Sequence, residues 1–184
     1  MDHPAFRPAP TTNASVDVCL VGSPHEPVMR FFVWEDVLDE LWFAAEYEPD
    51  RRCMCVLTGL YGLADDGPFI EVTGFEGLEY PEAMLDAIAP TMAQIEELVG
   101  DRPTLIDAHR PSAVGFFVHE PGSDALLDDH AIVLHLTLFN VPYQIALVAD
   151  ARAGKIAMYA RQPRQKFFNA CFHKISRKER SEEE

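Results

Sequence analysis

A short stretch of this sequence concentrates side chains that can bind metal ions. Its members are His119, Glu120, Asp128, Asp129, His130 and His135. Imidazole nitrogens and carboxylate oxygens are zinc ligands, and a hydrolytic zinc site needs three of them plus an open position for water. A general base, normally a glutamate, then handles the proton of that water. One hypothesis is therefore a metal-dependent hydrolase with ligands at His119, Glu120 and His130.

The strand expected before this stretch opposes that hypothesis. Side chains alternate between the two faces of a strand, so His119 should face away from Val118 and Glu120. Three ligands must converge on one point, and this alternation separates two of the candidates. The competing interpretation is that these histidines are structural or exposed to solvent, with no cofactor bound.

The four cysteines, Cys19, Cys53, Cys55 and Cys171, form no CxxC pair. Cys53 and Cys55 are two residues apart in an apolar run, which places both on one face of an expected strand. We expect buried, reduced thiols of low reactivity, because a thiol in apolar surroundings stays protonated. A zinc-binding or redox pair is the alternative.

The hydrophobic pattern predicts an α/β domain that positions these groups. Apolar residues recur at helical spacing over 34–48 and 81–99, and a buried helix is expected over 126–139. Strands are expected over 28–33, 53–61, 68–75, 113–118, 143–149 and 155–159, with 53–75 forming a hairpin around the Asp65-Asp66-Gly67 turn. This order predicts an α/β sandwich around a mixed central sheet flanked by helices.

Two motifs add a family resemblance. The first is GFFVHEPG at 115–122, and the second is LFNVPYQIALVAD at 138–150. Together with Leu57-Thr58-Gly59, they resemble the MPN/JAMM (JAB-like) family of zinc hydrolases, over roughly residues 27–160. The resemblance implies a single MPN domain with a cytidine-deaminase-like sandwich fold.

The resemblance also implies where a metal site would lie. The family pattern has a glutamate base before the first glycine, an H-x-H pair on a strand, and a serine and an aspartate ligand on a helix. At these five positions this sequence has Arg52, Val118, Glu120, Asp128 and Ala131. Arg52 would place a fixed positive charge where Zn²⁺ should bind. His130 precedes the helix ligand position by one residue, about 100° around a helix.

Three functions follow as alternatives. The resemblance with its substituted ligand positions implies a non-catalytic MPN-like module that binds a protein partner or a second copy of itself. A metal-dependent isopeptidase or peptidase, with zinc held by relocated ligands around Glu120 and His130, is the second. The third is a small α/β domain unrelated to the family.

Charge restricts the partners. The formal net charge is -15, yet seven of the 15 basic residues fall in the last 24 positions, 161–184. An acidic body repels phosphates, because nucleic-acid binding depends on Lys and Arg replacing condensed counterions. We therefore expect no nucleic-acid partner. With no signal peptide or 18-residue uncharged run recognised, a cytoplasmic protein is expected and membrane binding is not.

The two ends of the chain are expected to differ from its body. Residues 1–26 are expected to be a flexible lead-in and 161–184 a basic amphipathic helix with a frayed acidic end. The helix is expected to fold back on the body, with a second subunit or a membrane surface as alternatives. The residues expected at an interface are apolar ones on two helix faces. They are Val37, Leu41, Trp42, Phe167, Phe168 and Phe172.

Overall fold

The computed structural model describes residues 9–10, 16–22, 29–99, 112–139, 144–161 and 167–177. Their elements follow the order β1 (Val16–Val21), β2 (Arg30–Trp34), α1 (Glu35–Tyr47), β3 (Cys53–Ala64), β4 (Gly67–Glu79), the 3₁₀ turn η2 (Met84–Ala87), α2 (Ile88–Val99), β5 (Ser112–His119), α3 (Asp129–Leu138), β6 (Ile145–Asp150), β7 (Lys155–Arg161), β8 (Phe167–Ala170) and β9 (Phe172–Arg177). The predicted α/β class is confirmed, and the hairpin predicted at 53–75 is observed as β3 and β4.

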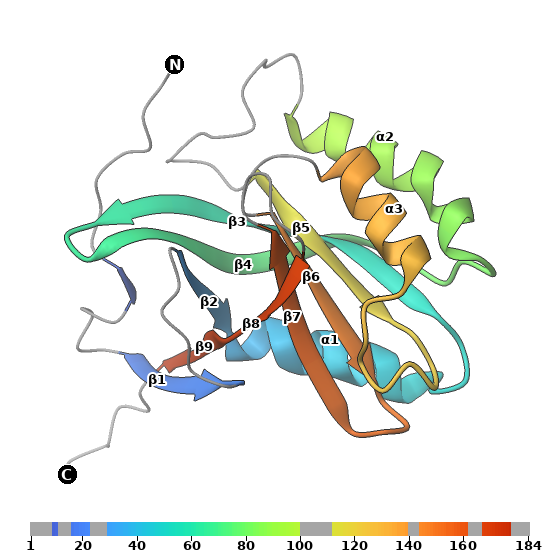
Figure 1. Ribbon diagram of the computed structural model, residues 1–184, viewed down its shortest axis with the longest axis horizontal. Helices are drawn as coiled ribbons and strands as arrows, with labels where there is room; N and C mark the ends of the chain where they lie inside the picture. The colour runs from blue at the N-terminus through green and yellow to red at the C-terminus, as the bar shows by residue number, and fades with distance from the viewer. Residues whose placement is uncertain are drawn as a thin grey trace, which may run out of the picture.

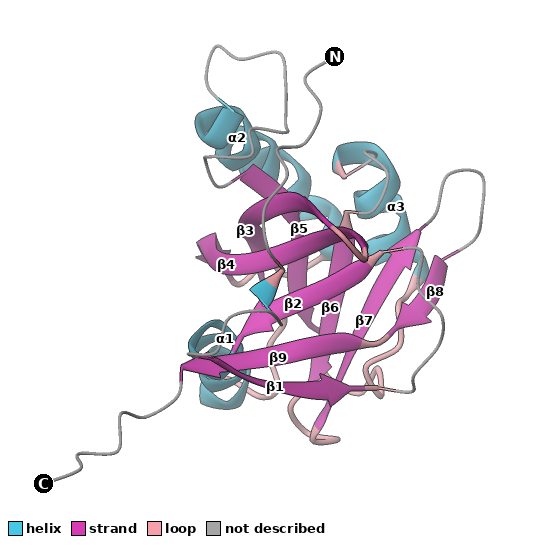
Figure 2. Ribbon diagram, turned by 90° about the vertical axis from the view of Figure 1, so that its left-hand side faces the viewer, coloured by secondary structure: helices cyan, strands magenta, loops and turns pink. Residues whose placement is uncertain are grey.

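The described strands form one mixed sheet in the order β1-β9-β2-β4-β3-β5-β6-β7-β8 (Figures 1 and 2). β5 and β6 run parallel, whereas β3 is antiparallel to both of its neighbours, β4 and β5. Phe172 of β9, near one end of the sheet, packs in the same core cluster as Met158 and Ala170 of β7 and β8, at the other end. The sheet is therefore curled rather than flat.

Helix α1 covers the concave side of this curl. Val37, Leu38 and Leu41 pack in the same core as Cys53, Cys55 and other β-strand side chains. These three residues follow the helical spacing that predicted the element, and Leu41 is fully buried. The helix predicted from Trp34 to Glu48 is confirmed to within one residue at each end.

Helices α2 and α3 lie side by side on the opposite face of the sheet (Figures 1 and 2). Ala131 and Leu134 of α3, with Met84 of η2, pack against Met54 and other residues of β3, β5 and β6. α3 begins at Asp129, later than predicted, because Asp128 is extended, with φ -83° and ψ 170°, and a helix starting at Leu126 cannot pass through it. The Asp128 side chain then caps the helix.

The helix predicted in the tail is wrong. Phe167 to Arg177 form two strands, β8 against β7 and β9 between β1 and β2. The residues whose spacing suggested a helix are divided at Cys171, where β8 ends and β9 follows. The tail thus joins the body as part of the sheet, because pairing with distant strands satisfies its backbone groups.

The flexible lead-in predicted over 1–26 needs the same correction. Val16 to Val21 form β1, which pairs with β9 from Val16↔Arg177 to Val21↔Phe172. Ala9 is buried beside Phe32, Phe69 and Ile175. Domain boundaries at 27 and 160 therefore cut through a single sheet. The rest of the lead-in, the acidic end 181–184 and the junction at 140–142 lie outside the described residues.

Among the helices that the structure describes, none has the length and apolar character needed to cross a membrane.

Candidate functional site

Arg52 and Glu120 meet where β3 begins and β5 ends. The register pairs Cys53 with His119 and Met54 with Val118, so its continuation sets Arg52 opposite Glu120 on the α3 side of the sheet. Their side chains form an ion pair from Arg52 Nε to a Glu120 carboxylate oxygen. Arg52 Nη1 also donates to the Glu82 carbonyl at 3.1 Å. The two side chains are 17% and 21% exposed, so solvent screens this pair only in part.

On the same side of the sheet as Arg52 and Glu120 lie Val118, Asp128 and Ala131. Val118 and Ala131 are 1% and 2% exposed and belong to one core cluster. The backbone N–H of Ala131 donates to Asp128 Oδ1 at 2.7 Å. Asp128 therefore serves as the N-cap of α3, where an aspartate both accepts this bond and interacts favourably with the helix dipole.

This arrangement has a clear electrostatic consequence. The Glu120 carboxylate, which could bind a cation, is bound to the guanidinium of Arg52. Arginine keeps its charge at all relevant pH values, so it competes permanently with any metal for that carboxylate. Val118 and Ala131 offer methyl groups where ligands would be needed. The five positions can stabilise the junction of β3, β5 and α3, but they cannot coordinate zinc as a set.

His119 lies on the opposite face, as its place in the strand predicts. It is fully buried, with Nε2 3.3 Å from Pro49 O and Nδ1 3.2 Å from Ala149 O. The Ala151 N–H also approaches Nδ1 at 3.5 Å. Each ring nitrogen faces a backbone carbonyl, and the nitrogen that carries a proton donates to the carbonyl beside it. The ring thus links the end of α1 to the turn after β6.

The proposed relocated ligands are not brought together. His119 is on the α1 side of the sheet, Glu120 is paired with Arg52, and His130 is exposed at the start of α3. His130 Nδ1 lies 3.6 Å from an Asp128 carboxylate oxygen. Within the parts of the chain that the structure describes, no group of three or more His, Cys, Asp or Glu side chains is placed to hold a metal ion.

Asp150 is a polar residue that the sequence analysis did not single out. It is 1% exposed at the end of β6 and accepts backbone N–H groups from Asp124 at 2.8 Å, Arg152 at 3.1 Å and Ala153 at 3.3 Å. Burial raises its pKa, but these hydrogen bonds outweigh that effect, so the pKa is lowered overall. The strongest signal in the sequence is its position between an apolar strand and the Ala151–Gly154 turn.

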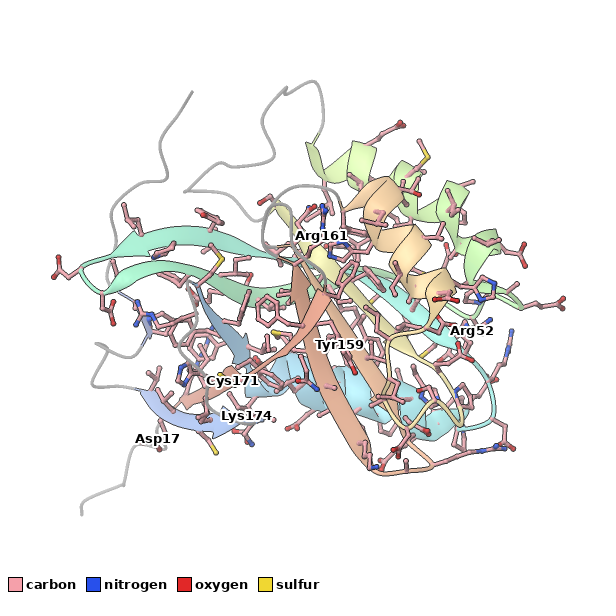
Figure 3. All side chains as sticks on the ribbon, viewed as in Figure 1. Asp17, Arg52, Tyr159, Arg161, Cys171 and Lys174 are labelled. Atoms are coloured by element: carbon pink, nitrogen blue, oxygen red, sulfur yellow. The ribbon has the colours of Figure 1, made fainter. Side chains whose placement is uncertain are left out.

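The loop between β5 and α3 is held at several points. Besides the bond to Asp150, Lys155 forms an ion pair with Asp124, and the Tyr159 hydroxyl donates to Ala125 O at 3.1 Å. Figure 3 shows Tyr159 on β7 and Arg52 near the start of β3. These contacts maintain the positive φ angles of Asp124 and Ala125, a conformation that costs free energy for non-glycine residues.

Glycines of the family-like motifs have a packing explanation. A Cβ added to Gly59 would lie 2.1 Å from Glu71 O, and one added to Gly115 would lie 2.1 Å from Ile145 O. Both positions therefore require glycine because neighbouring strands approach closely. These two residues are explained without reference to catalysis.

His135 forms a second buried polar group on the α3 side. Its Nε2 donates to Gln144 O at 2.8 Å, and Gln144 Nε2 donates to Ala113 O at 2.9 Å. Burial lowers the pKa of His135, which keeps the ring neutral. Nδ1 has no hydrogen-bond partner among the described residues. Its neighbours are the aromatic rings of Phe116, Phe139 and Phe167.

Three of the four cysteines are buried as predicted, whereas the prediction is wrong for Cys19. Cys53 and Cys55 are both buried in the α1-side core, which confirms that they share a face. Burial raises the pKa of Cys53 to about 11, and burial also raises the pKa of Cys55 well above its ordinary value. Neither is a reactive thiolate near neutral pH. Cys171 is also buried, whereas Cys19 is exposed on β1.

The residues expected at an interface lie mostly in the core. Val37, Leu41 and Phe172 are at most 6% exposed, so the prediction that they form an exposed contact surface is wrong. Trp42 and Phe168 are half-buried and pack against the same core, and Phe167 is half-buried against His135. The apolar spacing that suggested a contact surface arises from burial within the chain.

Two surface hollows lie away from Arg52 and Glu120. One, of about 310 Å³, is lined by Trp34, Arg177 and the acidic start of α1. The other, of about 340 Å³, lies between the end of β1 and strands β7 and β8. The residues that line these two hollows do not include Arg52, Val118, Glu120, Asp128 or Ala131.

Comparison with known proteins places few constraints on function. No protein-family model matches this sequence, and no curated protein sequence matches it. Among solved structures, the chain is similar to protein DSY2949 from Desulfitobacterium hafniense, with a TM-score of 0.46 and 12% sequence identity over 76% of this chain and 89% of that one. The structure itself defines the class, which is a mixed α/β protein with a large curled sheet and few helices.

Proposed function

We propose that this chain is a non-catalytic MPN-like domain that acts as a protein-protein interaction or scaffold module. The observation that carries the proposal is the Arg52–Glu120 ion pair at the junction of β3, β5 and α3. In the family that the motifs resemble, these two positions hold the general base and a zinc ligand. An arginine paired with a glutamate there supports loss of metal binding and retention of the fold.

The rest of the junction supports the same proposal. Zinc hydrolysis needs at least three ligands and a water position, whereas Val118 and Ala131 supply only apolar atoms. Asp128 is occupied as a helix cap. Each of these residues has contacts within the junction that do not involve an ion, which supports retention of the fold without metal.

A surface for partner binding is available on the outer side of α2 and α3. The exposed apolar side chains of this layer are Leu85, Met92, Leu126, Val133 and Leu136, each at least 43% exposed. Val133 and Leu136 lie one turn apart on α3, a surface helix that is apolar on both its faces. Such a helix is usually covered, and exposed apolar patches mark interaction sites.

Charge indicates the kind of partner that fits this surface. The segments 81–99 and 123–138 contain seven acidic residues and no Lys or Arg. A second copy of the same surface would bring like charges together. The complementary partner is a protein segment with apolar side chains flanked by Lys or Arg.

Metal analysis tests the loss of the zinc site. The wild-type protein, dialysed against zinc and then buffer, is expected to retain no stoichiometric zinc. A variant that restores the family pattern, Arg52→Glu with Val118→His, Glu120→His and Ala131→Asp, is expected to bind zinc and to melt at a higher temperature when zinc is added. Arg52→Met alone is the matched control, because it removes the cation without adding a ligand.

The opposite result has an equally clear meaning. Stoichiometric zinc in the wild-type protein, together with hydrolysis of peptide substrates, would replace the proposal with a metal-dependent isopeptidase or peptidase. A restored variant that folds but binds no zinc would mean that this junction does not have the geometry of the family's zinc site, and the resemblance would then not support the proposal.

Partner binding is tested with an amphipathic helical peptide as the probe, in which Leu side chains form one face and Lys side chains flank them. Calorimetric titration is expected to show binding that Leu136→Glu weakens about tenfold, the loss expected when one apolar contact is removed. Phe43→Glu on α1, where Phe43 is 68% exposed, is the matched control and should leave binding unchanged. Equal binding of the peptide by both variants would remove this surface from the proposal.

A further inference from the structure

The turn between β3 and β4 contains the one Asp-Gly sequence of the chain, at Asp66 and Gly67. The register pairs Ala64 with Gly67, so Asp65 and Asp66 form a two-residue loop. The Asp66 side chain is 62% exposed. Gly67 has a φ angle of 117°, a conformation that favours glycine. The turn therefore joins an exposed carboxylate to a residue that its backbone conformation requires to be glycine.

A glycine after an aspartate permits a reaction within the chain itself. The backbone nitrogen of the following residue can attack the side-chain carboxyl carbon of the aspartate, and a side chain on that residue would crowd the approach. Gly67 has no side chain, and a Cβ added there would meet no heavy atom of the described neighbours within 4 Å. The space beside Gly67 is therefore open to the rearrangement.

Arg30, at the start of β2, holds the reacting carboxylate. Its Nη1 donates to Asp66 Oδ2 and its Nη2 donates to Asp66 Oδ1, so the ion pair is bidentate. The Arg30 side chain is 16% exposed, and its guanidinium lies 5.6 Å from the centroid of the Phe32 ring. Because both carboxylate oxygens are bound, the carboxyl carbon turns toward the Gly67 nitrogen only when this pair opens.

We propose that Asp66 is a site of spontaneous isoaspartate formation and that Arg30 limits the rate. The Gly67 nitrogen forms a bond to Cγ of the protonated Asp66 carboxyl group, whose hydroxyl leaves with the amide proton as water. The succinimide ring that results takes up one water molecule at either of its two carbonyl carbons. Opening at Cγ restores aspartate, whereas opening at the main-chain carbonyl carbon gives isoaspartate. The net reaction is an isomerisation, without an oxidant or a reductant.

The product changes the structure of the turn. Isoaspartate leads the main chain through Cβ and Cγ, which lengthens a loop whose length matches the pairing of Ala64 with Gly67. Its carboxylate is attached directly to Cα, so it no longer reaches Arg30 in the same geometry. β2 pairs with β4 from Arg30↔Phe69 onward, and we expect this end of the pairing to loosen. Figure 1 shows the β3–β4 turn far from α2 and α3, so the modification is independent of the proposed partner surface.

Incubation of the folded full chain at physiological temperature and pH tests the proposal. A protein isoaspartyl methyltransferase with labelled S-adenosylmethionine detects the product, and peptide mapping locates it. Isoaspartate is expected to accumulate in the peptide that spans 62–69. Arg30→Gln is expected to raise this rate about two- to fivefold, the factor that corresponds to loss of a partly exposed ion pair. The same chain unfolded in urea gives the rate without the ion pair and should react faster than the folded protein.

Two matched variants control for charge and for the identity of the site. Arg152→Gln removes an exposed ion pair with Asp50, which is followed by Arg51 rather than glycine, and should leave the rate at Asp66 unchanged. Asp66→Glu keeps a carboxylate near Arg30 but closes only a larger and slower-forming ring, so the peptide spanning 62–69 should stay unlabelled. The melting temperature of each variant shows that it folds.

Three results would overturn the proposal. One is a folded wild-type chain whose peptide 62–69 stays unlabelled while the unfolded chain becomes labelled there. Another is label confined to other aspartates. The third is an equal rate at Asp66 in the wild-type protein and in a folded Arg30→Gln variant, which would remove Arg30 from the proposal. If Arg30→Gln does not fold, Arg30→Lys replaces it, because lysine keeps the charge without the bidentate contact and should accelerate the reaction less.

Discussion

Neighbouring residues at the end of β5 satisfy their polar groups in different ways. On the α3 side, Glu120 binds Arg52 in a pair that is still partly exposed to water. His119, on the α1 side, and Asp150, at the end of β6, are buried and bonded to backbone groups of turns. The Arg52–Glu120 pair therefore keeps some contact with solvent, whereas His119 and Asp150 have their partners inside the fold.

The difference shows which polar residues matter for structure. A buried polar group that loses its partners costs the full desolvation free energy, whereas a partly exposed one can turn to water. His119 and Asp150 should therefore respond more strongly to substitution than the Arg52–Glu120 pair.

The largest effect is expected from Asp150→Ala. Three backbone N–H groups lose their acceptor, and the free energy of unfolding should fall by about 3 kcal/mol, as for loss of charge-assisted hydrogen bonds. Asp150→Asn keeps one acceptor oxygen, so its free energy of unfolding should fall by less than that of Asp150→Ala. Urea unfolding measures both variants. A loss from Asp150→Ala smaller than that from Arg52→Ala would contradict the contrast between buried and partly exposed polar groups.

A smaller loss, of about 1–3 kcal/mol, is expected from Arg52→Ala, because a half-buried glutamate is left without its cation. Glu120→Leu combined with Arg52→Met should be less destabilising than the sum of the two single changes. Chemical denaturation of the wild-type protein, Arg52→Met, Glu120→Leu and the double variant gives the coupling energy of the pair by a double-mutant cycle. A coupling energy near zero would mean that the pair does not contribute to stability.

Asp128→Ala is expected to cost about 1 kcal/mol, the usual effect of removing an N-cap side chain. His130→Ala is the control at the same helix end, because His130 is exposed and should change stability by less than about 0.5 kcal/mol. Thermal unfolding compares the two. Equal losses would indicate that the Asp128–His130 contact, rather than the cap, provides the stabilisation.

The pH dependence gives the finest comparison. Burial holds the pKa of His135 below its ordinary value of 6.5. The folded state therefore binds a proton less readily than the unfolded chain. The contribution of neutral His135 to the free energy of unfolding is complete above pH 6.5 and is lost as the pH falls below that value. Unfolding free energies measured from pH 7.5 to 5 should decline, and His135→Gln should make the decline shallower.

Local patterns in the sequence predicted most of the central structure. The run of apolar residues from Cys53 indicated a buried strand, and the turn at Asp65-Asp66-Gly67 indicated the hairpin. Alternation along a strand was sufficient to place His119 on the face opposite Val118. These predictions succeeded because they depend on residues a few positions apart, whose relation is set by backbone geometry.

The tail shows where such patterns fail. Phe167, Phe168, Cys171, Phe172 and Ile175 have a spacing that suits one face of a helix, yet they lie in two strands. β9 pairs with β1 and β2, which are more than 130 residues earlier in the chain. No local pattern in the sequence indicates strand partners that are so distant, so the same apolar spacing is compatible with a helix or with two strands.

The sequence by itself determined the α/β class, the burial of Cys53 and Cys55 on one face of a strand, and the placement of His119 on the face opposite Val118. Only the tertiary structure decided that Arg52 and Glu120 form a pair, that Asp150 holds two turns, and that both chain ends complete the sheet. The physical reason is that periodicity specifies which face of an element is apolar. Which elements meet at that face depends on non-local pairing, and this is also what brings opposite charges into contact.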